Sequence, residues 1–318
     1  MIQVNCELSH LQLRWSPHRV DNAKMKTPRR SARAPGKPKP AQRPLLAVDG
    51  DSFAHRAFHG LPKTIRMRGG KGGGAIVGFA NYLIRFVSEF SPRAVIVGWD
   101  TLEVPTYRHK AFPAYQSGRH FDREILEQLR LLPDFVAACG FANGKAPGYE
   151  ADDFLAAAAA AEQRRKGTAI VASGDRDTFQ LASDRTTIVY PEKGGVLARI
   201  DPAEVVRRYR VLPEQVPDFI ALRGDPSDKL PGAKGVGAIG AAGLLLQYGT
   251  LERALQDGKF AGQADQLRLY RRIATMDAKA PLPPLPNRSP KWGRAATLAR
   301  EWELNGLADR LEKLAEQG

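Results

Sequence analysis

Short apolar segments that lead to an aspartate constrain the fold of this chain more than any other feature of its sequence. Residues 45–49 and 94–100 each end in one, and residues 169–172 are followed within three positions by Asp175. Such short apolar runs are typical of strands that are buried on both faces of a sheet. Segments with helical spacing lie after them, at residues 78–90, 123–139 and 150–165. This alternation predicts an α/β fold whose central sheet is mostly parallel and is flanked by helices.

The predicted elements and the composition divide the chain into three regions. Two further short strands are expected at residues 186–190 and 196–200, and the chain reads as helical from Pro202 onward. We therefore expect a core at residues 45–200 and a helical C-terminal region at residues 201–318. Residues 1–44 are predicted to be a disordered basic extension, because they are rich in Lys, Arg and Pro and show no hydrophobic period.

The charge of the chain suggests a polyanionic partner. The formal net charge is +14 over 318 residues, but residues 1–44 hold ten of the basic residues and only two acids, which is +8. A solvated extension explains this segment as well as a DNA-binding arm does. The only cysteines, Cys6 and Cys139, lack metal-site spacing and are expected to be reduced thiols of a cytoplasmic protein. The sequence shows neither a membrane span nor a signal peptide.

Acidic residues collect where the predicted strands end. Ligands of open α/β sheets bind beyond the carboxyl ends of the strands, so these acids should lie close together. Each group alone suits a helix cap or a turn, but so many carboxylates at one edge would repel unless cations were bound. Oxygen ligands favour Mg²⁺ or Mn²⁺ over zinc. The acids are Asp49, Asp100, Glu150, Asp152, Asp153, Asp175, Asp177, Asp225 and Asp228.

A glycine-rich segment at residues 230–240 follows the last of these acids. Its glycines match the dinucleotide fingerprint G-x-G-x-x-G, but no strand precedes them and no suitably spaced acid follows. A helix–hairpin–helix over residues 216–248 explains the segment better, with helices at 216–222 and 239–248. Glycines let the backbone approach a phosphate, and a helix N-terminus offers free amides. A simple helix-capping turn is the alternative.

Taken together, the motifs resemble those of the 5′-nuclease family, which includes flap endonucleases and the N-terminal nuclease domain of bacterial DNA polymerase I. The resemblance runs from about Leu45 to the C-terminus and keeps the order and spacing of the motifs. They are Asp49-Gly50 with Arg56 and Phe58-His59, Trp99-Asp100, Tyr107-Arg108-His109, Tyr115 with Gly118-Arg119, the segment 147–153, Gly174-Asp175-Arg176-Asp177, and the segment 224–232 with the hairpin.

The resemblance implies a stand-alone 5′-3′ exonuclease or flap endonuclease that hydrolyses DNA phosphodiesters near 5′ ends by a two-metal-ion mechanism, in DNA replication and repair. One Mg²⁺, or Mn²⁺ in its place, would lie among Asp49, Asp100, Glu150 and Asp152, with Asp153 nearby. A second would lie among Asp175, Asp177, Asp225 and Asp228.

The resemblance also implies the DNA contacts of a monomer. Residues 101–148 would form a helical arch that takes the free 5′ end. Cations expected to act on the scissile phosphate are Arg56, Arg108, Lys110 and Arg119. Residues expected to contact flaps, nicks and junctions are Tyr115, Lys234, Gly235, Val236, Gly237, Ile239 and Gly240, with a K⁺ ion at the hairpin.

Two positions depart from the family pattern. Gln116 stands where many relatives carry lysine, and Lys110 or Arg119 would have to substitute. Asp51 is an extra acid, which we interpret as a helix cap rather than an outer ligand. Two other functions are weighed: a catalytically silent junction-binding protein, and a phosphatase of the haloacid-dehalogenase type with Asp49 as nucleophile. The second leaves Glu150, Asp225 and the hairpin unexplained.

Overall fold

Six strands form the central sheet of the computed structural model, which describes residues 43–118 and 120–317. Its order is β5-β4-β1-β6-β7-β8, and all neighbours are parallel except the last pair. The strands are β1 (Leu45–Asp49), β4 (Ala94–Gly98), β5 (Ala142–Gly144), β6 (Ala169–Ala172), β7 (Thr186–Pro191) and β8 (Leu197–Ile200). The α/β fold with a mostly parallel sheet is therefore confirmed.

Strand β1 lies at the centre of the sheet, and its five residues are all buried. Leu45 is in register with Ala94 of β4 and with Ala169 of β6. Because these three strands are parallel, their carboxyl ends reach the same edge. The segments that follow them, with their acids, therefore start side by side.

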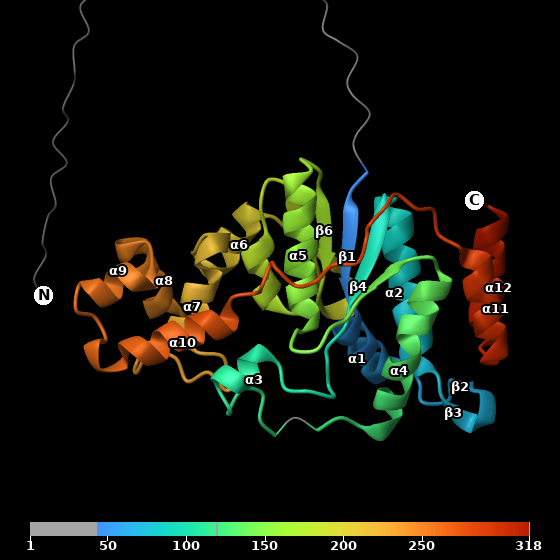
Figure 1. Ribbon diagram of the computed structural model, residues 1–318, viewed down its shortest axis with the longest axis horizontal. Helices are drawn as coiled ribbons and strands as arrows, with labels where there is room; N and C mark the ends of the chain where they lie inside the picture. The colour runs from blue at the N-terminus through green and yellow to red at the C-terminus, as the bar shows by residue number, and fades with distance from the viewer. Residues whose placement is uncertain (1–42, 119, 318) are drawn as a thin grey trace, which may run out of the picture. The chain divides into compact units, whose positions relative to one another are not determined.

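Helices cover both faces of the sheet (Figure 1). Side chains of a strand alternate between its faces, so Leu46 and Val48 enter one core cluster while Leu45 and Ala47 enter the other. The first cluster contains buried residues of α1 (Gly50–Gly60), α2 (Gly74–Phe90), α4 (Arg123–Ala138), α11 (Trp292–Glu301) and α12 (Asn305–Glu316). The second contains residues of α5 (Ala151–Arg164) and of the helices that follow β8.

The alanine-rich helix α5 packs very close to the sheet. A Cβ on Gly98, at the end of β4, would lie 2.7 Å from the carbonyl oxygen of Ala151. Only glycine permits this approach without a shift of the backbone. It brings the first turn of α5, with Glu150 and Asp152, next to the ends of the central strands.

The helical C-terminal region consists of α6 (Pro202–Tyr209), α7 (Val216–Arg223), α8 (Ala238–Tyr248), α9 (Leu251–Gln256) and α10 (Ala264–Ala274). An extended segment then returns across the molecule to α11 and α12 (Figure 1). Buried Arg93 anchors this segment, since its guanidinium pairs with Glu162 and donates to the carbonyl oxygen of Leu285 at 2.8 Å. Among the helices of residues 43–118 and 120–317, none combines the length and apolar character that a membrane span needs.

Several local elements were not predicted from the sequence. Residues 66–72 form the short antiparallel hairpin β2 (Arg66–Met67) and β3 (Lys71–Gly72), which the sequence pattern did not predict. The three-residue strand β5 and the helix α1 were not predicted. The segment expected as an arch contains α3 (Tyr107–Ala111) and α4, and α4 packs against α2 and α11 in the core. The expected extension at residues 1–44 lies almost entirely outside the described residues.

Candidate active site

A cavity of about 510 Å³ lies at the carboxyl edge of the central strands. It is lined by acids from six separate segments: the end of β1, α1, the segment after β4, the start of α5, the segment after β6 and the loop after α7. These acids are Asp49, Asp51, Asp100, Glu150, Asp152, Asp175, Asp177 and Asp225. We call this cavity the acid pocket. Seven of the nine predicted metal ligands line it; Asp153 and Asp228 do not.

Backbone amides hold several of these carboxylates in place. Asp49 is the N-cap of α1, accepting from the amide of Ser52 at 2.9 Å, and it also accepts from the hydroxyl of Ser173 at 2.7 Å. Asp100 accepts from the amide of Ala151 at 2.9 Å. Each bond uses a carboxylate oxygen without supplying a positive charge. Positive charge comes instead from Arg176 and Arg223, which also line the pocket, and Arg223 lies 3.5 Å from Asp225. Acids still outnumber these cations in the lining.

The interpretation of Asp51 as a helix cap was wrong, because Asp49 fills that role. Asp51 instead lines the acid pocket and accepts from the amide of Asp100 at 2.8 Å. It lies in the first turn of α1, two residues after the capping acid. That spacing was the available signal, since it keeps both carboxylates near the N-terminal end of one helix.

Crowding and burial make the acid pocket hard to ionise. The pKa of Asp49 is raised to about 7, chiefly by burial and also by the charges of Asp100 and Asp175, while hydrogen bonds from Ser173 and Ser52 oppose the shift. Burial likewise raises the pKa of Glu150 to about 7. It also raises the pKa values of Asp51, Asp152 and Asp177, each with help from neighbouring carboxylates. Bound cations would relieve this repulsion.

The donor set fits hard divalent cations. All eight acids offer oxygen, and half-buried Asp152 and Asp177 remain reachable from the cavity. Within residues 43–118 and 120–317, no three acidic, histidine or cysteine side chains already stand in the arrangement of a metal site.

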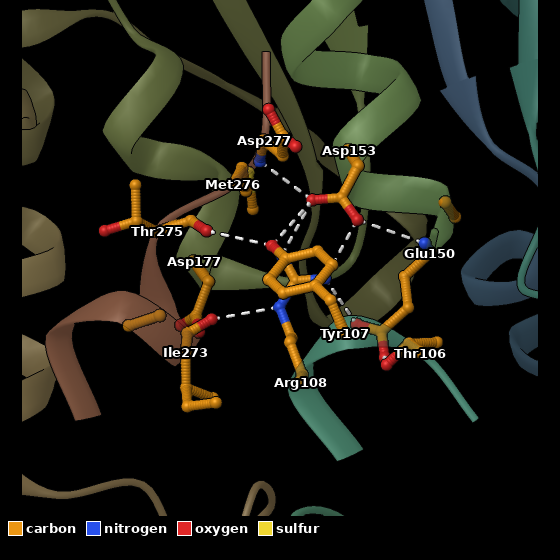
Figure 2. Close-up of polar contacts among 12 residues, drawn as sticks. Thr106, Tyr107, Arg108, Glu150, Asp153, Asp177, Ile273, Thr275, Met276 and Asp277 are labelled. Carbon is orange, nitrogen blue, oxygen red and sulfur yellow. Dashed lines mark hydrogen bonds and ion pairs between the residues drawn. The ribbon is translucent and has the colours of Figure 1, made fainter. Parts of the chain in front are cut away.

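Arg108 and Asp153 form a buried pair behind the acid pocket (Figure 2). Arg108 is 2% exposed and donates to Glu150 at 2.8 Å, to Asp153 at 2.8 Å and to the carbonyl oxygen of Ile273 at 2.9 Å. Asp153 is fully buried and also accepts from the hydroxyl of Tyr107 and the amide of Asp277. The roles expected for Arg108 and Asp153 at the phosphate and the metal stay predictions. Arg108 is not open to a phosphate, and Asp153 already has a full set of donors.

Arg108 therefore acts on the pocket through Glu150. Its guanidinium lowers the pKa of that carboxyl against the effect of burial, and so helps to keep it ionised. The same side chain joins α3 to α5 and to α10. We regard Arg108 as a positioning residue.

Breaking this buried network should strongly destabilise the protein. Arg108→Met leaves two carboxylates without their cation, and we expect the free energy of unfolding to fall by about 3–5 kcal/mol. Urea denaturation followed by circular dichroism measures this. Arg123→Met is the matched control, because the pair of Arg123 with Glu127 is exposed and should contribute almost nothing. Equal stability of both variants would contradict the role given to Arg108.

Tyr115 and Gln116 connect the segment after α3 to the pocket. Tyr115 was expected to contact DNA. In the structure it is 3% exposed and its hydroxyl donates to Glu150 at 3.0 Å, so it lies behind the site. The side-chain amide of Gln116 donates to Tyr115 at 2.7 Å and to Asp228 at 3.0 Å. Gln116 thus bridges this segment to the loop after α7. Asp228 lies near the pocket, since its charge contributes to the raised pKa of Asp177.

The remaining predicted cations occupy different places. Arg56 is exposed on α1, and its guanidinium lies 3.5 Å from where a Cβ on Gly174 would be. Lys110 is exposed and lines two neighbouring cavities rather than the acid pocket. Arg119 lies outside the described residues.

Helices α7 and α8 form the predicted hairpin. Gly232 has φ +76°, and a Cβ there would lie 2.5 Å from the amide nitrogen of Gly224. The amide of Ala233 donates back to the carbonyl oxygen of Leu222 at 2.8 Å. Most of the residues expected to contact DNA are exposed, and Ile239 is 85% exposed. The turn therefore presents its backbone to solvent.

Comparisons with known proteins agree with this arrangement. Residues 44–210 match the family model described as 5′-3′ exonuclease, N-terminal resolvase-like domain, and residues 211–290 match 5′-3′ exonuclease, C-terminal SAM fold. DNA polymerase I of Mycobacterium bovis is 39% identical over 216 residues, which are 67% of this chain and 24% of that protein. Thermostable DNA polymerase I of Thermus aquaticus is 36% identical over 248 residues, 75% of this chain and 29% of that protein. The chain thus spans about a quarter of the length of these curated relatives.

Solved structures share the fold. The T5 D15 protein, co-crystallised with metal ions, superposes with a TM-score of 0.60 at 18% identity, covering 86% of this chain and 100% of that one. The catalytic core of Rad2 in complex with DNA substrate gives a TM-score of 0.53 at 15% identity, covering 85% and 92%. By its sequence matches over most of the described residues, this chain belongs to the 5′-3′ exonuclease family.

Proposed function

We propose that this chain hydrolyses DNA phosphodiester bonds near 5′ ends, as a 5′-3′ exonuclease and flap endonuclease that depends on divalent metal ions. The observation that carries the proposal is the acid pocket, in which eight carboxylates meet in a chain of net charge +14. A protein that only binds DNA gains nothing from acids placed where they repel the phosphates. We further propose that it acts as a monomer in the cytoplasm, in replication and repair.

Two Mg²⁺ ions would occupy the pocket, with Mn²⁺ as a substitute. Asp49, Asp100, Glu150 and Asp152 would hold the first, and Asp175, Asp177 and Asp225, with Asp228 nearby, would hold the second. When bound, such ions lower the pKa of a coordinated water and neutralise charge on phosphate oxygens. The metal ions co-crystallised with the T5 D15 protein support a metal cofactor.

The protein's own groups would position the DNA. Arg56, whose guanidinium lies beside Gly174, would act on the phosphate to be cut. The family resemblance gives the same role to Arg119. Exposed backbone amides of the hairpin, at Gly235 and Gly237, would bind a phosphate of the duplex without reading its sequence, with K⁺ bridging to it. The DNA complex of the Rad2 catalytic core supports this partner.

A time course with three substrates tests the proposal. A 5′-labelled flap, a nicked duplex and a blunt duplex are incubated with the full chain, with Mg²⁺ and with EDTA. We expect cleavage near the 5′ junction with Mg²⁺ and none with EDTA. Tight flap binding without cutting in Mg²⁺ or Mn²⁺ would support the silent junction binder instead. Hydrolysis of sugar phosphates with no DNA cleavage would support the phosphatase.

A further inference from the structure

A second large cavity, of about 800 Å³, lies between α3 and α10. Its lining differs from that of the acid pocket, because cations and aromatic rings predominate. They are Tyr107, Lys110, Tyr149, Arg268, Arg271 and Arg272. The acids that also line it, Glu252 and Asp277, leave an excess of two positive charges. We call it the basic cavity.

Its three arginines come from one helix. Arg268, Arg271 and Arg272 of α10 are spaced three and four residues apart, so they share a face of the helix. Arg268 pairs with Glu252 at 2.7 Å, and Arg271 lies 2.8 Å from Asp218. Within the described part of the chain, no ion pair forms at Arg272 or at Lys110. Two cations of this cavity therefore remain available to an anion.

The two tyrosines add flat surfaces beside these cations. Tyr107 and Tyr149 are both partly exposed. Tyr107 also lies under the guanidinium of Arg108, 4.6 Å from its ring centre, and donates to Asp153, so its ring is held in one position. Fixed aromatic rings beside exposed cations are the combination with which proteins bind single-stranded nucleic acid: the cations hold phosphates and the rings stack on bases.

A third cavity, of about 670 Å³, shares lining residues with both the basic cavity and the acid pocket. Lys110 lines both the third cavity and the basic cavity. Asp100, Gln116, Phe121 and Glu150 line both the third cavity and the acid pocket. The three hollows therefore follow one another around the segment at residues 101–121.

The wall of this third cavity is partly apolar. Leu102, Val104 and Phe121 line it and are 45%, 41% and 37% exposed. Exposed apolar side chains in a hollow suit contact with the faces of unpaired bases. Paired bases would not present those faces. The path from the acid pocket to the basic cavity thus favours a single strand.

Resting on the proposed function, we infer that the basic cavity between α3 and α10 binds the single-stranded 5′ tail of the substrate on the far side of α3 from the acid pocket. Arg272 and Lys110 contact its phosphates, and Tyr107 and Tyr149 stack with its bases. The site assists only those substrates whose tail is long enough to reach it.

Charge reversal at Arg272 tests this site. Binding is measured in EDTA by fluorescence anisotropy with a dye-labelled duplex that carries a 5′ tail of about 12 nucleotides, and with the same duplex lacking a tail. We expect Arg272→Glu to weaken binding of the tailed duplex about tenfold and to change the affinity for the untailed duplex far less. Arg294→Glu, an exposed charge reversal on α11, is the matched control and should alter neither.

Cleavage rates complete the design. With Mg²⁺, the rate on the tailed substrate relative to the nicked duplex should fall in Arg272→Glu and stay constant in Arg294→Glu. An equal loss of affinity for tailed and untailed DNA would overturn the inference, because the cavity would then bind duplex. Wild-type behaviour of Arg272→Glu on tailed DNA would also overturn it, while leaving the proposed nuclease intact. Failure of the wild-type chain to cut any substrate would instead refute the proposed function.

Discussion

Asp100→Asn is expected to slow cleavage of a 5′ flap at least about 10³-fold, while the affinity for the flap stays within about threefold. Asparagine keeps the oxygen that accepts from the amide of Ala151, so the start of α5 stays in place. The substitution removes one negative charge at the meeting point of the strand ends. Divalent ions lose a charged ligand there, whereas the contacts that hold DNA elsewhere are unchanged.

Single-turnover cleavage and anisotropy binding on the same flap separate these two effects. Asp134→Asn removes an exposed acid on α4, outside the acid pocket, and should leave both quantities unchanged. Cleavage by Asp100→Asn at the wild-type rate would contradict the assignment of the pocket. A parallel loss of binding and cleavage would show that the substitution had damaged the fold, which a melting curve would reveal.

The sequence predicted the parts of this fold that depend on local pattern. The strands at residues 45–49 and 169–172 were predicted with the bounds that the structure has, because a buried parallel strand is a continuous apolar run between polar segments. Convergence of Asp49, Asp100 and Asp175 follows from the same reasoning. Parallel strands that are neighbours must end at one edge.

What the sequence could not predict are partners that meet only in the folded chain. Arg108 and Asp153 are 45 positions apart, and nothing local indicates that they form a buried pair. The same is true of Tyr115, whose hydroxyl reaches Glu150 across 35 positions. A family motif shows that such residues matter without showing whether they face the substrate or support a residue that does. Strand β5 was missed because a run of three residues carries almost no periodic signal.

The acid pocket should also reduce the stability of the metal-free protein, and Asp152→Asn should reveal this. Burial and the charges of Asp175 and Asp49 raise the pKa of Asp152 well above the ordinary carboxyl value of about 3.9. Between the pKa of the unfolded state and the raised pKa of the folded state, the folded protein holds a proton that the unfolded chain has lost. The free energy of unfolding therefore falls as the pH rises between these two values. Asparagine has no charge to bury. In EDTA at pH 8, we expect a gain of about 1–2 kcal/mol, or a melting temperature about 2–5 °C higher.

Three comparisons make this prediction specific. Below about pH 3 the difference in stability should vanish, because the carboxyl of Asp152 is then protonated in both states. Saturating Mg²⁺ should remove the difference in melting temperature between variant and wild type at pH 8. Binding of Mg²⁺ to the folded state stabilises the wild type, whereas the variant has lost one of the carboxylates that would hold the ion. Asp134→Asn should melt like the wild type under all these conditions. A variant that melts lower than the wild type in EDTA at pH 8 would mean that Asp152 stabilises the fold, and the claim that these acids stand together only because cations bind them would fail.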